Sequence, residues 1–412
     1  MNLTRRQIFV CSLITLAALP SCLTDATVEG FTPLGRTSQE TTDTDQQLAN
    51  TDTRQLAPDM AGAADGIQSD AAPDINGTDD FNQLDSAETP DRTDEASDWS
   101  LDAPETSVDL GEDQTNTAAS EPILVGVIAD MNGSYGSTTY VSQVRDAVTR
   151  LTELNPDVVL SAGDMVAGQK AGLDYDAMWD AFHEAVSDPL AEAGIPFAVT
   201  PGNHDASGYS GYAGERAIFQ SEWSNRRPDV DFVDDSNYPL SYSFVVGPAF
   251  FISLDATKVG NLDQTQMNWI EDQLIEAEER GYDVTIVYGH VPLYGFAIGR
   301  ETEILDDDEL EELLLDHHVD LVISGHHHAY YPGRRDDLRL VGTACLGTGP
   351  RPLIGTDETS ARSLLLFEVS ESGVEWLDAY GGSDFTVPIE RSDLPSSVGS
   401  GSGLIWRDDL DF

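Results

Sequence analysis

Five short apolar segments, each followed directly by polar residues, constrain the fold of this chain more than any other feature of its sequence. Each segment has four to seven residues and contains β-branched side chains, which is typical of strands that are buried on both faces of a sheet. The segments lie at residues 123–129, 158–162, 196–200, 284–288 and 321–324.

Helical periodicity separates several of these segments, because apolar residues recur there every three to four positions. Strands that alternate with helices predict a layered α/β fold. A hairpin with its turn at Gly247 and Pro248 is expected over residues 243–254. Residues 206–239 show no clear period and are expected to form a wall or lid over a cleft. The expected helices span residues 138–154, 175–193, 263–280 and 306–316.

Side chains that bind metals follow all five apolar segments. Ligands of open α/β sheets bind beyond the carboxyl ends of the strands, so these side chains are expected to meet at one rim. Glycine precedes four of the positions and permits tight turns that aim the next side chain. Carboxylate, amide and imidazole groups that converge in this way predict a metal site. The motifs are Asp130, Gly163-Asp164, Gly202-Asn203-His204-Asp205, Gly289-His290 and Gly325-His326-His327-His328.

In order and spacing these motifs resemble those of the calcineurin-like metallophosphoesterase family, whose members are binuclear metallophosphatases. The family pattern is D-x-H, G-D, G-N-H-[DE], G-H and G-H-x-H, and the resemblance covers about 200 residues of this chain. It implies a four-layer α/β/β/α fold, in which a β-sandwich is flanked by helices. It also implies two divalent transition-metal ions (Mn, Fe or Zn) that lie about 3.5–4 Å apart.

The resemblance also assigns a role to each matching residue. A metal-bridging hydroxide would attack the phosphorus of a phosphomonoester or phosphodiester in line. His204 would act as the general acid at the leaving oxygen, and Asp205 would orient the His204 ring from behind. The implied metal ligands are Asp164 as the bridge, Asp130 and His328 at one ion, and Asn203, His290 and His326 at the other.

Asn132 departs from the family pattern, because a histidine usually stands at that position. An amide oxygen is a weaker ligand than imidazole for a transition metal. Either Asn132 ligates through its oxygen, or the first ion keeps an extra water, or the first site is only partly occupied. Tyr135 lies between two loop glycines and either approaches the metals or packs under its loop. Ala167 stands where the related purple acid phosphatases have a tyrosine, so membership of that branch is not expected.

Two other kinds of function are compatible with parts of this pattern. A non-catalytic binding module on a metallophosphoesterase fold is the alternative that a weakened first metal site at Asn132 would favour. A zinc hydrolase of a non-phosphate substrate is permitted by the histidines alone, but the ordered set of five motifs disfavours it. Arg351 and the pair Arg334 and Arg335 either bind substrate phosphate or form structural ion pairs.

The overall charge excludes two kinds of partner. The chain has 412 residues, with 74 acidic and 21 basic side chains, and a net charge of −53. No basic face could neutralise a run of phosphates, so nucleic-acid binding through such a face is not expected. Adhesion to an anionic membrane surface by charge alone is excluded for the same reason. A small-molecule or macromolecular phosphate ester is the expected substrate.

The first 22 residues are expected to be an export signal. Arg5 and Arg6 precede an apolar run over residues 8–19 that is too short to span a bilayer comfortably. Residues 4–9 resemble a twin-arginine motif, and an ordinary secretion signal with two arginines is the alternative. Residues 19–22 resemble a lipobox. Cys22 is therefore expected to be lipidated and to anchor an exported protein that faces the periplasm or the cell exterior.

The rest of the chain is expected to form three parts. Residues 23–120 hold 23 acidic side chains and three arginines. They cannot bury enough apolar surface to offset their ordering entropy, so a disordered acidic linker is expected. The catalytic domain is expected at residues 121–390, followed by a C-terminal tail at 391–412. Cys345 lies among small and apolar residues of this domain and is expected to be buried rather than reactive.

Overall fold

The computed structural model describes residues 121–410. The expected export signal, the lipidation site at Cys22 and the linker lie outside this part of the chain. Among the described residues, no helix combines the length and the apolar character needed to cross a membrane. Cys345 is buried and unpaired there, as its apolar surroundings predict.

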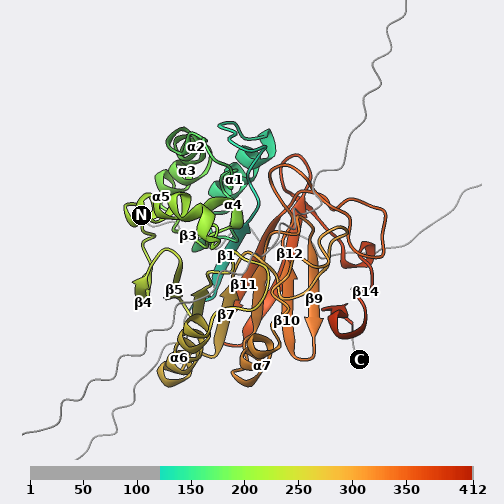
Figure 1. Cartoon of the computed structure of the whole chain (residues 1–412). Helices are drawn as coiled ribbons and strands as arrows, with labels where there is room; N and C mark the ends of the chain where they lie inside the picture. Colours follow the sequence, from blue (N-terminus) through green and yellow to red (C-terminus); the bar gives the residue numbers. More distant parts are fainter. Residues whose placement is uncertain (1–120, 411–412) are drawn as a thin grey trace, which may run out of the picture. The chain divides into compact units, whose positions relative to one another are not determined.

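Two β-sheets form the centre of the described part (Figure 1). The first sheet has six strands. The neighbouring strands β1, β2 and β3 run parallel, and β3 lies at the edge of the sheet. In spatial order its strands are β13 (Val387–Pro388), β12 (Gly373–Gly381), β11 (Leu364–Ser370), β1 (Ile123–Ile128), β2 (Val158–Ser161) and β3 (Phe197–Val199).

The second sheet has nine strands, of which β6, β7, β8 and β10 run parallel. Its strands are, in spatial order, β14 (Ser397–Val398), β15 (Ile405–Arg407), β9 (Tyr331–Arg335), β10 (Leu338–Gly342), β8 (Leu321–Ser324), β7 (Val284–Tyr288), β6 (Ala249–Ser253), β5 (Ser241–Val246) and β4 (Asp231–Asn237).

Helices cover the outer faces of both sheets. Against the first sheet pack α1 (Ser142–Leu154), α2 (Tyr175–Phe182), α3 (Asp188–Glu192) and α5 (Ala213–Ser224). Against the second sheet pack α6 (Gln264–Arg280) and α7 (Asp308–Asp316).

Three apolar clusters fill the spaces between these four layers. On β1, Val125 and Val127 belong to the cluster between the sheets, together with Phe251 of the second sheet. The intervening Gly126 faces α1 so closely that a Cβ there would lie 2.6 Å from Cδ2 of Leu151. Alternate residues of β1 thus face opposite sides of the sheet, as expected for a pleated strand. The expected α/β/β/α architecture is confirmed.

The local predictions agree closely with the observed elements. All five apolar segments form strands, namely β1, β2, β3, β7 and β8, and the expected hairpin forms β5 and β6. The expected helix at 175–193 runs through α2, a π-helical turn (His183–Ser187) and α3. Residues 206–239, expected as an irregular wall or lid, contain α5 instead. That helix buries Phe219 and Trp223, whose packing decides its position.

The expected C-terminal tail at residues 391–412 is wrong for residues 391–410. There β15 pairs antiparallel with β9 and so extends the second sheet. Arg391 forms ion pairs with Asp378 and Asp408, which fasten this segment to β12. A strand of only three residues gives no periodic signal, and its place depends on long-range pairing. The folded domain therefore continues to residue 410.

Candidate metal centre

The candidate ligands follow the carboxyl ends of β1, β2 and β3 in the first sheet and of β7 and β8 in the second. Backbone bonds join their turns: the N–H of Asp130 donates to the carbonyl of Gly163 at 3.0 Å, and that of Gly325 donates to the carbonyl of His290 at 3.0 Å. Between the sheets, the N–H of His326 donates to the Asp130 carboxylate at 3.1 Å. The strand ends therefore bring these residues together, as predicted.

Glycine is required where the turns meet, because their backbones approach too closely for a side chain. A Cβ on Gly163 would lie 2.6 Å from Nδ1 of His290. A Cβ on Gly202 would lie 2.1 Å from the backbone nitrogen of Asp164. The two glycines therefore set the distance between turns that carry three of the expected ligands.

Four of the expected ligands have backbones in the left-handed region. Non-glycine residues adopt this region rarely, at a cost of about 1–3 kcal/mol each, and mostly where surrounding contacts hold them for function. The strain supports a functional role for these four turns. The φ angles are +49° at Asp130, +54° at Asp164, +65° at His326 and +54° at His328.

The side chains around His290 present lone pairs to one another. Nδ1 of His290 faces the carbonyl oxygen of Ala162 at 2.8 Å and donates to it, which leaves Nε2 of the neutral ring as an acceptor. Nε2 in turn faces Oδ1 of Asn203 at 2.9 Å and Oδ1 of Asp164 at 3.4 Å. The amide nitrogen of Asn203 donates to Oε1 of Gln169 at 3.2 Å, so the amide oxygen is the atom turned toward His290.

His326 adds another ring nitrogen to this group. Its Nδ1 lies 3.3 Å from Nε2 of His290, while its Nε2 faces Oε2 of Glu303 at 3.2 Å. Glu303 thereby fixes the ring with Nδ1 turned inward. One proton can satisfy only one pair of these facing acceptors, whereas a divalent cation among them would satisfy them all. The mixed nitrogen and oxygen donors fit a first-row transition metal.

A second group of donors adjoins the first. Nε2 of His328 lies 3.2 Å from Oδ1 of Asp130, and its Nδ1 faces the carbonyl oxygen of Gly349 at 3.0 Å. Ligand atoms of Asp130, Asp164 and His290 all lie within 4.8 Å of one another, so the two groups are contiguous. The donor set therefore fits two neighbouring cations that share the carboxylates.

The carboxylates create a strongly negative field at this place. Burial would lower the pKa of His290, but the adjacent Asp164 carboxylate raises that pKa to about 9. Burial acts likewise on His328, yet the Asp130 carboxylate raises its pKa to about 11. Burial would raise the pKa of Asp164, which His290 and His204 instead hold well below its usual range. The cluster attracts positive charge, as a cation site must.

The cluster opens into a cavity of about 330 Å³. Asn132 is buried in its wall, and the backbone N–H of Asn132 donates to the carbonyl oxygen of Asp164 at 3.1 Å. Ala167 also lines the cavity, where its methyl group offers no oxygen to a metal. Tyr135 lines the cavity with 55% of its surface exposed, so it is not packed under its loop.

His204 lines the same cavity, but Asp205 does not orient its ring as expected. Nδ1 of His204 faces the carbonyl oxygen of Gly168 at 3.4 Å. Asp205 accepts backbone hydrogen bonds from Val166 at 2.8 Å and Gly202 at 3.1 Å. Its carboxylate points inward and is fully buried, which raises its pKa well above the usual value. Asp205 therefore ties two ligand turns together rather than supporting the imidazole.

Arg300 and Glu303 complete the site, although no sequence motif marks them. Arg300 lines the cavity and pairs with Glu303, the carboxylate that also holds His326. In the described part of the chain, Nε of Arg300 is buried without a hydrogen-bond partner. Burial and the neighbouring charge of Arg351 lower the pKa of Arg300. Both residues lie in a loop after β7, where neither spacing nor periodicity distinguishes them.

The other arginines considered for phosphate binding have different surroundings. Arg334 donates to the carbonyl oxygen of Leu410 at 3.1 Å, and Arg335 forms an ion pair with Glu311 at 2.6 Å. These two arginines have the structural role. Arg351 lies near Arg300, so a second positive charge is close to the cavity wall.

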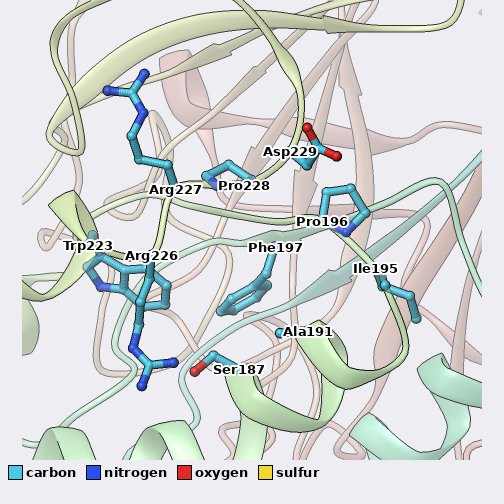
Figure 2. Close-up of a pocket in the computed structure, with 11 residues that line it drawn as sticks. Ser187, Ala191, Ile195, Pro196, Phe197, Trp223, Arg226, Arg227, Pro228 and Asp229 are labelled. Carbon is cyan, nitrogen blue, oxygen red and sulfur yellow. The ribbon is translucent and has the colours of Figure 1, made fainter.

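A second cavity of about 330 Å³ lies between α3, β3 and the end of α5 (Figure 2). Its wall includes Phe197, Trp223 and two arginines, and none of the expected ligands. Arg226 is paired with Asp188 at 2.7 Å, and Arg227 is paired with Asp235. Because both charges have partners, this cavity offers no comparable chemistry.

The model of the calcineurin-like phosphoesterase family matches residues 123–330, half of the chain. The chain belongs to the calcineurin-like phosphoesterase family. The matched region begins at β1 and ends just after His328, so it contains all the expected ligands of this chain. The resemblance seen in the five motifs is confirmed.

The named relatives of this chain include both a purple acid phosphatase and a serine/threonine-protein phosphatase. Purple acid phosphatase 18 of Arabidopsis thaliana is 29% identical over 218 residues, which are 52% of this chain and 45% of that protein. Serine/threonine-protein phosphatase CPPED1 of Bos taurus is 28% identical over 203 residues, 45% of this chain and 60% of that protein. The chain thus spans about half the length of the curated relatives it matches.

The solved structures support the same fold. Purple acid phosphatase PPD1 from yellow lupin (Lupinus luteus) matches with a TM-score of 0.52 and 18% identity, over 65% of this chain and 53% of that one. The likeness concerns the fold, since Ala167 lacks the phenol expected in the purple branch.

The close approach at Gly163 generates a test of the site. Gly163→Ala should reduce metal content, because its Cβ would displace the His290 ring. Gly172 is the matched control: its φ is +79° against +89° at Gly163, but a Cβ there would have nothing within 4 Å. Both changes should cost about 1–2 kcal/mol of folding stability through the positive φ. Metal analysis with denaturant unfolding of both variants separates the effects, and equal metal content would contradict the proposed role of Gly163.

Proposed function

We propose that this protein hydrolyses phosphate esters at the cavity formed by the two donor groups. The observation that carries the proposal is the set of nitrogen and oxygen atoms that converge around His290, which a metal ion would bind together. Phosphatase names among the relatives and the family match agree with it.

Two divalent ions would be held by Asp164 between the groups, with the remaining ligands divided as the family resemblance implies. Bound there, they would supply a strong nucleophile from water near neutral pH and would polarise the phosphoryl oxygens. Mn, Fe or Zn would suit the donors better than Mg or Ca. Backbone N–H groups hold both carboxylates in place: that of His326 donates to Asp130, and that of His204 donates to Asp164 at 2.9 Å.

The remaining residues of the cavity would handle the substrate. His204 is partly exposed, so its ring can reach an ester oxygen and donate a proton to the leaving group. Arg300 would offer its guanidinium to the phosphoryl oxygens. The binding-module alternative rests on Asn132 alone. A binding module would have to retain these mostly buried ligands, four of them with strained backbones, for a purpose other than hydrolysis.

Two substitutions separate the proposed role of His204 as general acid from that of Asp164 as metal ligand. His204→Asn should keep both metal ions, because the ring is not among the expected ligands, and should lower turnover about 10²–10⁴-fold. The loss should be greatest for substrates with poor leaving groups. Asp164→Asn should lose metal and abolish turnover. Metal stoichiometry and kinetics on good and poor leaving groups provide the readout. Full activity of Asp164→Asn, or a wild type that binds no metal, would exclude the two-metal mechanism.

Asn132→His tests whether position 132 touches the first ion. The residue borders two cavities, so an imidazole has room. A ring nitrogen binds late first-row metals more strongly than an amide oxygen, so the affinity of one ion should rise. The affinity of the ion held by His290 and His326 should stay the same and is the internal control. Calorimetric titration with Zn²⁺ or Mn²⁺ measures both, and two unchanged affinities would show that position 132 is not a ligand.

We also propose that the protein is exported and anchored by a lipid on Cys22. The support is the leader sequence: two arginines, a short apolar run and a lipobox-like ending. Several acyl chains would anchor it stably, since each buried methylene contributes about 0.8 kcal/mol.

Cys22→Ser should therefore move the protein from the membrane fraction to the soluble fraction. Cys11→Ser is the matched control, because Cys11 lies within the leader and would be removed by cleavage before Cys22. Cell fractionation and mass spectrometry of the mature N-terminus decide the matter. An unmodified N-terminus at another residue would rule out the anchor.

A further inference from the structure

We propose that Tyr135 is a stacking surface for the leaving group, and that the enzyme prefers phosphate esters whose leaving group carries a planar aromatic ring. This inference rests on the proposed phosphoesterase function and adds a substrate class to it. It is carried by the juxtaposition of an exposed aromatic ring, the cavity and His204.

Tyr135 is an exposed aromatic residue that lies outside the apolar core. It lines the cavity with 55% of its surface exposed. Within the described residues its hydroxyl makes no hydrogen bond, and its ring belongs to none of the three apolar clusters. Most of the ring is left in solvent, so it would gain further free energy when a ligand covers it.

The loop that carries Tyr135 is held in place by backbone bonds. The N–H of Gly136 donates to the carbonyl oxygen of Ala167 at 2.9 Å, in the turn that follows Asp164. The N–H of Ser137 donates to the carbonyl oxygen of Ser134 at 2.8 Å, which closes a tight turn around the tyrosine. The loop backbone therefore has a fixed position relative to the candidate metal ligands, and ligand binding need not order it.

The position of the ring relative to His204 identifies which part of a substrate it would contact. The two ring centroids lie 5.4 Å apart with an interplanar angle of 55°. As the proposed general acid, His204 must face the leaving oxygen. The group attached to that oxygen would then extend along Tyr135, on the side away from the phosphoryl oxygens.

Charge around the ring favours an electron-rich partner as well. Nζ of Lys170 lies 5.9 Å from the centroid of Tyr135, and Lys170 is one of only two lysines in the chain. A planar aromatic group gains from offset stacking or edge-to-face contact with the tyrosine ring and from the nearby cation, whereas an alkyl group gains little beyond the buried area.

The test compares phenyl phosphate with butyl phosphate in the metal-loaded enzyme. Tyr135→Ala should lower kcat/KM for phenyl phosphate roughly 3- to 10-fold, mainly through KM, and should leave the value for butyl phosphate within about twofold. Tyr135→Phe should retain the wild-type preference, because stacking needs the ring and not the hydroxyl. Tyr209→Ala is the matched control, since Tyr209 is 48% exposed but does not line the cavity.

Calorimetric binding of phenylphosphonate and butylphosphonate provides a readout that is independent of turnover. Tyr135→Ala should weaken the phenyl compound by the same factor and leave the butyl compound unchanged. Equal losses for both compounds, or a loss on Tyr135→Phe as large as on Tyr135→Ala, would overturn the stacking role. Wild-type enzyme that hydrolyses no phosphomonoester or phosphodiester would instead refute the proposed function, so the two failures are distinguishable.

Discussion

The closeness with which the strand-end turns approach one another is the constraint on which the site depends. At Gly163 and Gly202 the backbones leave no space for a single methyl group. Asp205 then joins the two turns by accepting hydrogen bonds from Val166 and Gly202. Because these contacts are made by backbone and by a fully buried carboxylate, the donors are positioned by the fold itself. Preorganisation of this kind is what electrostatic catalysis requires.

The negative charge of this protein opposes the binding of an anionic substrate, so the site needs local positive charge. A net charge of −53 repels an anionic ester over long distances, and the buried carboxylates would strengthen that repulsion at the cavity. Two divalent ions would reverse the sign of the field there. Arg300 at the cavity wall, Arg351 beside it and Lys170 over the Tyr135 ring place scarce basic residues at the same end of the domain.

The sequence predicted those parts of the structure that local patterns determine. The five apolar segments predicted strands to within one residue of the observed bounds, because each carries its own signal of burial. The residues after them meet because parallel strands share an edge. Arg300, Glu303 and the role of Asp205 could not be predicted, since they depend on loop conformation. The strand β15 was missed because its pairing with β9 joins residues about 70 positions apart.

Drawing the donors from both sheets has a consequence for folding. Asp130 follows a strand of the first sheet and His326 and His328 follow a strand of the second, so an ion held among them would bridge the two halves of the sandwich. Only the assembled sandwich presents that arrangement, and a ligand selective for the folded state adds about 2.7 kcal/mol to stability at a hundredfold excess over its Kd. Bound metal would then contribute to the folding stability of the sandwich as well as to its chemistry. Chelation would remove that contribution and weaken the connection between the two sheets.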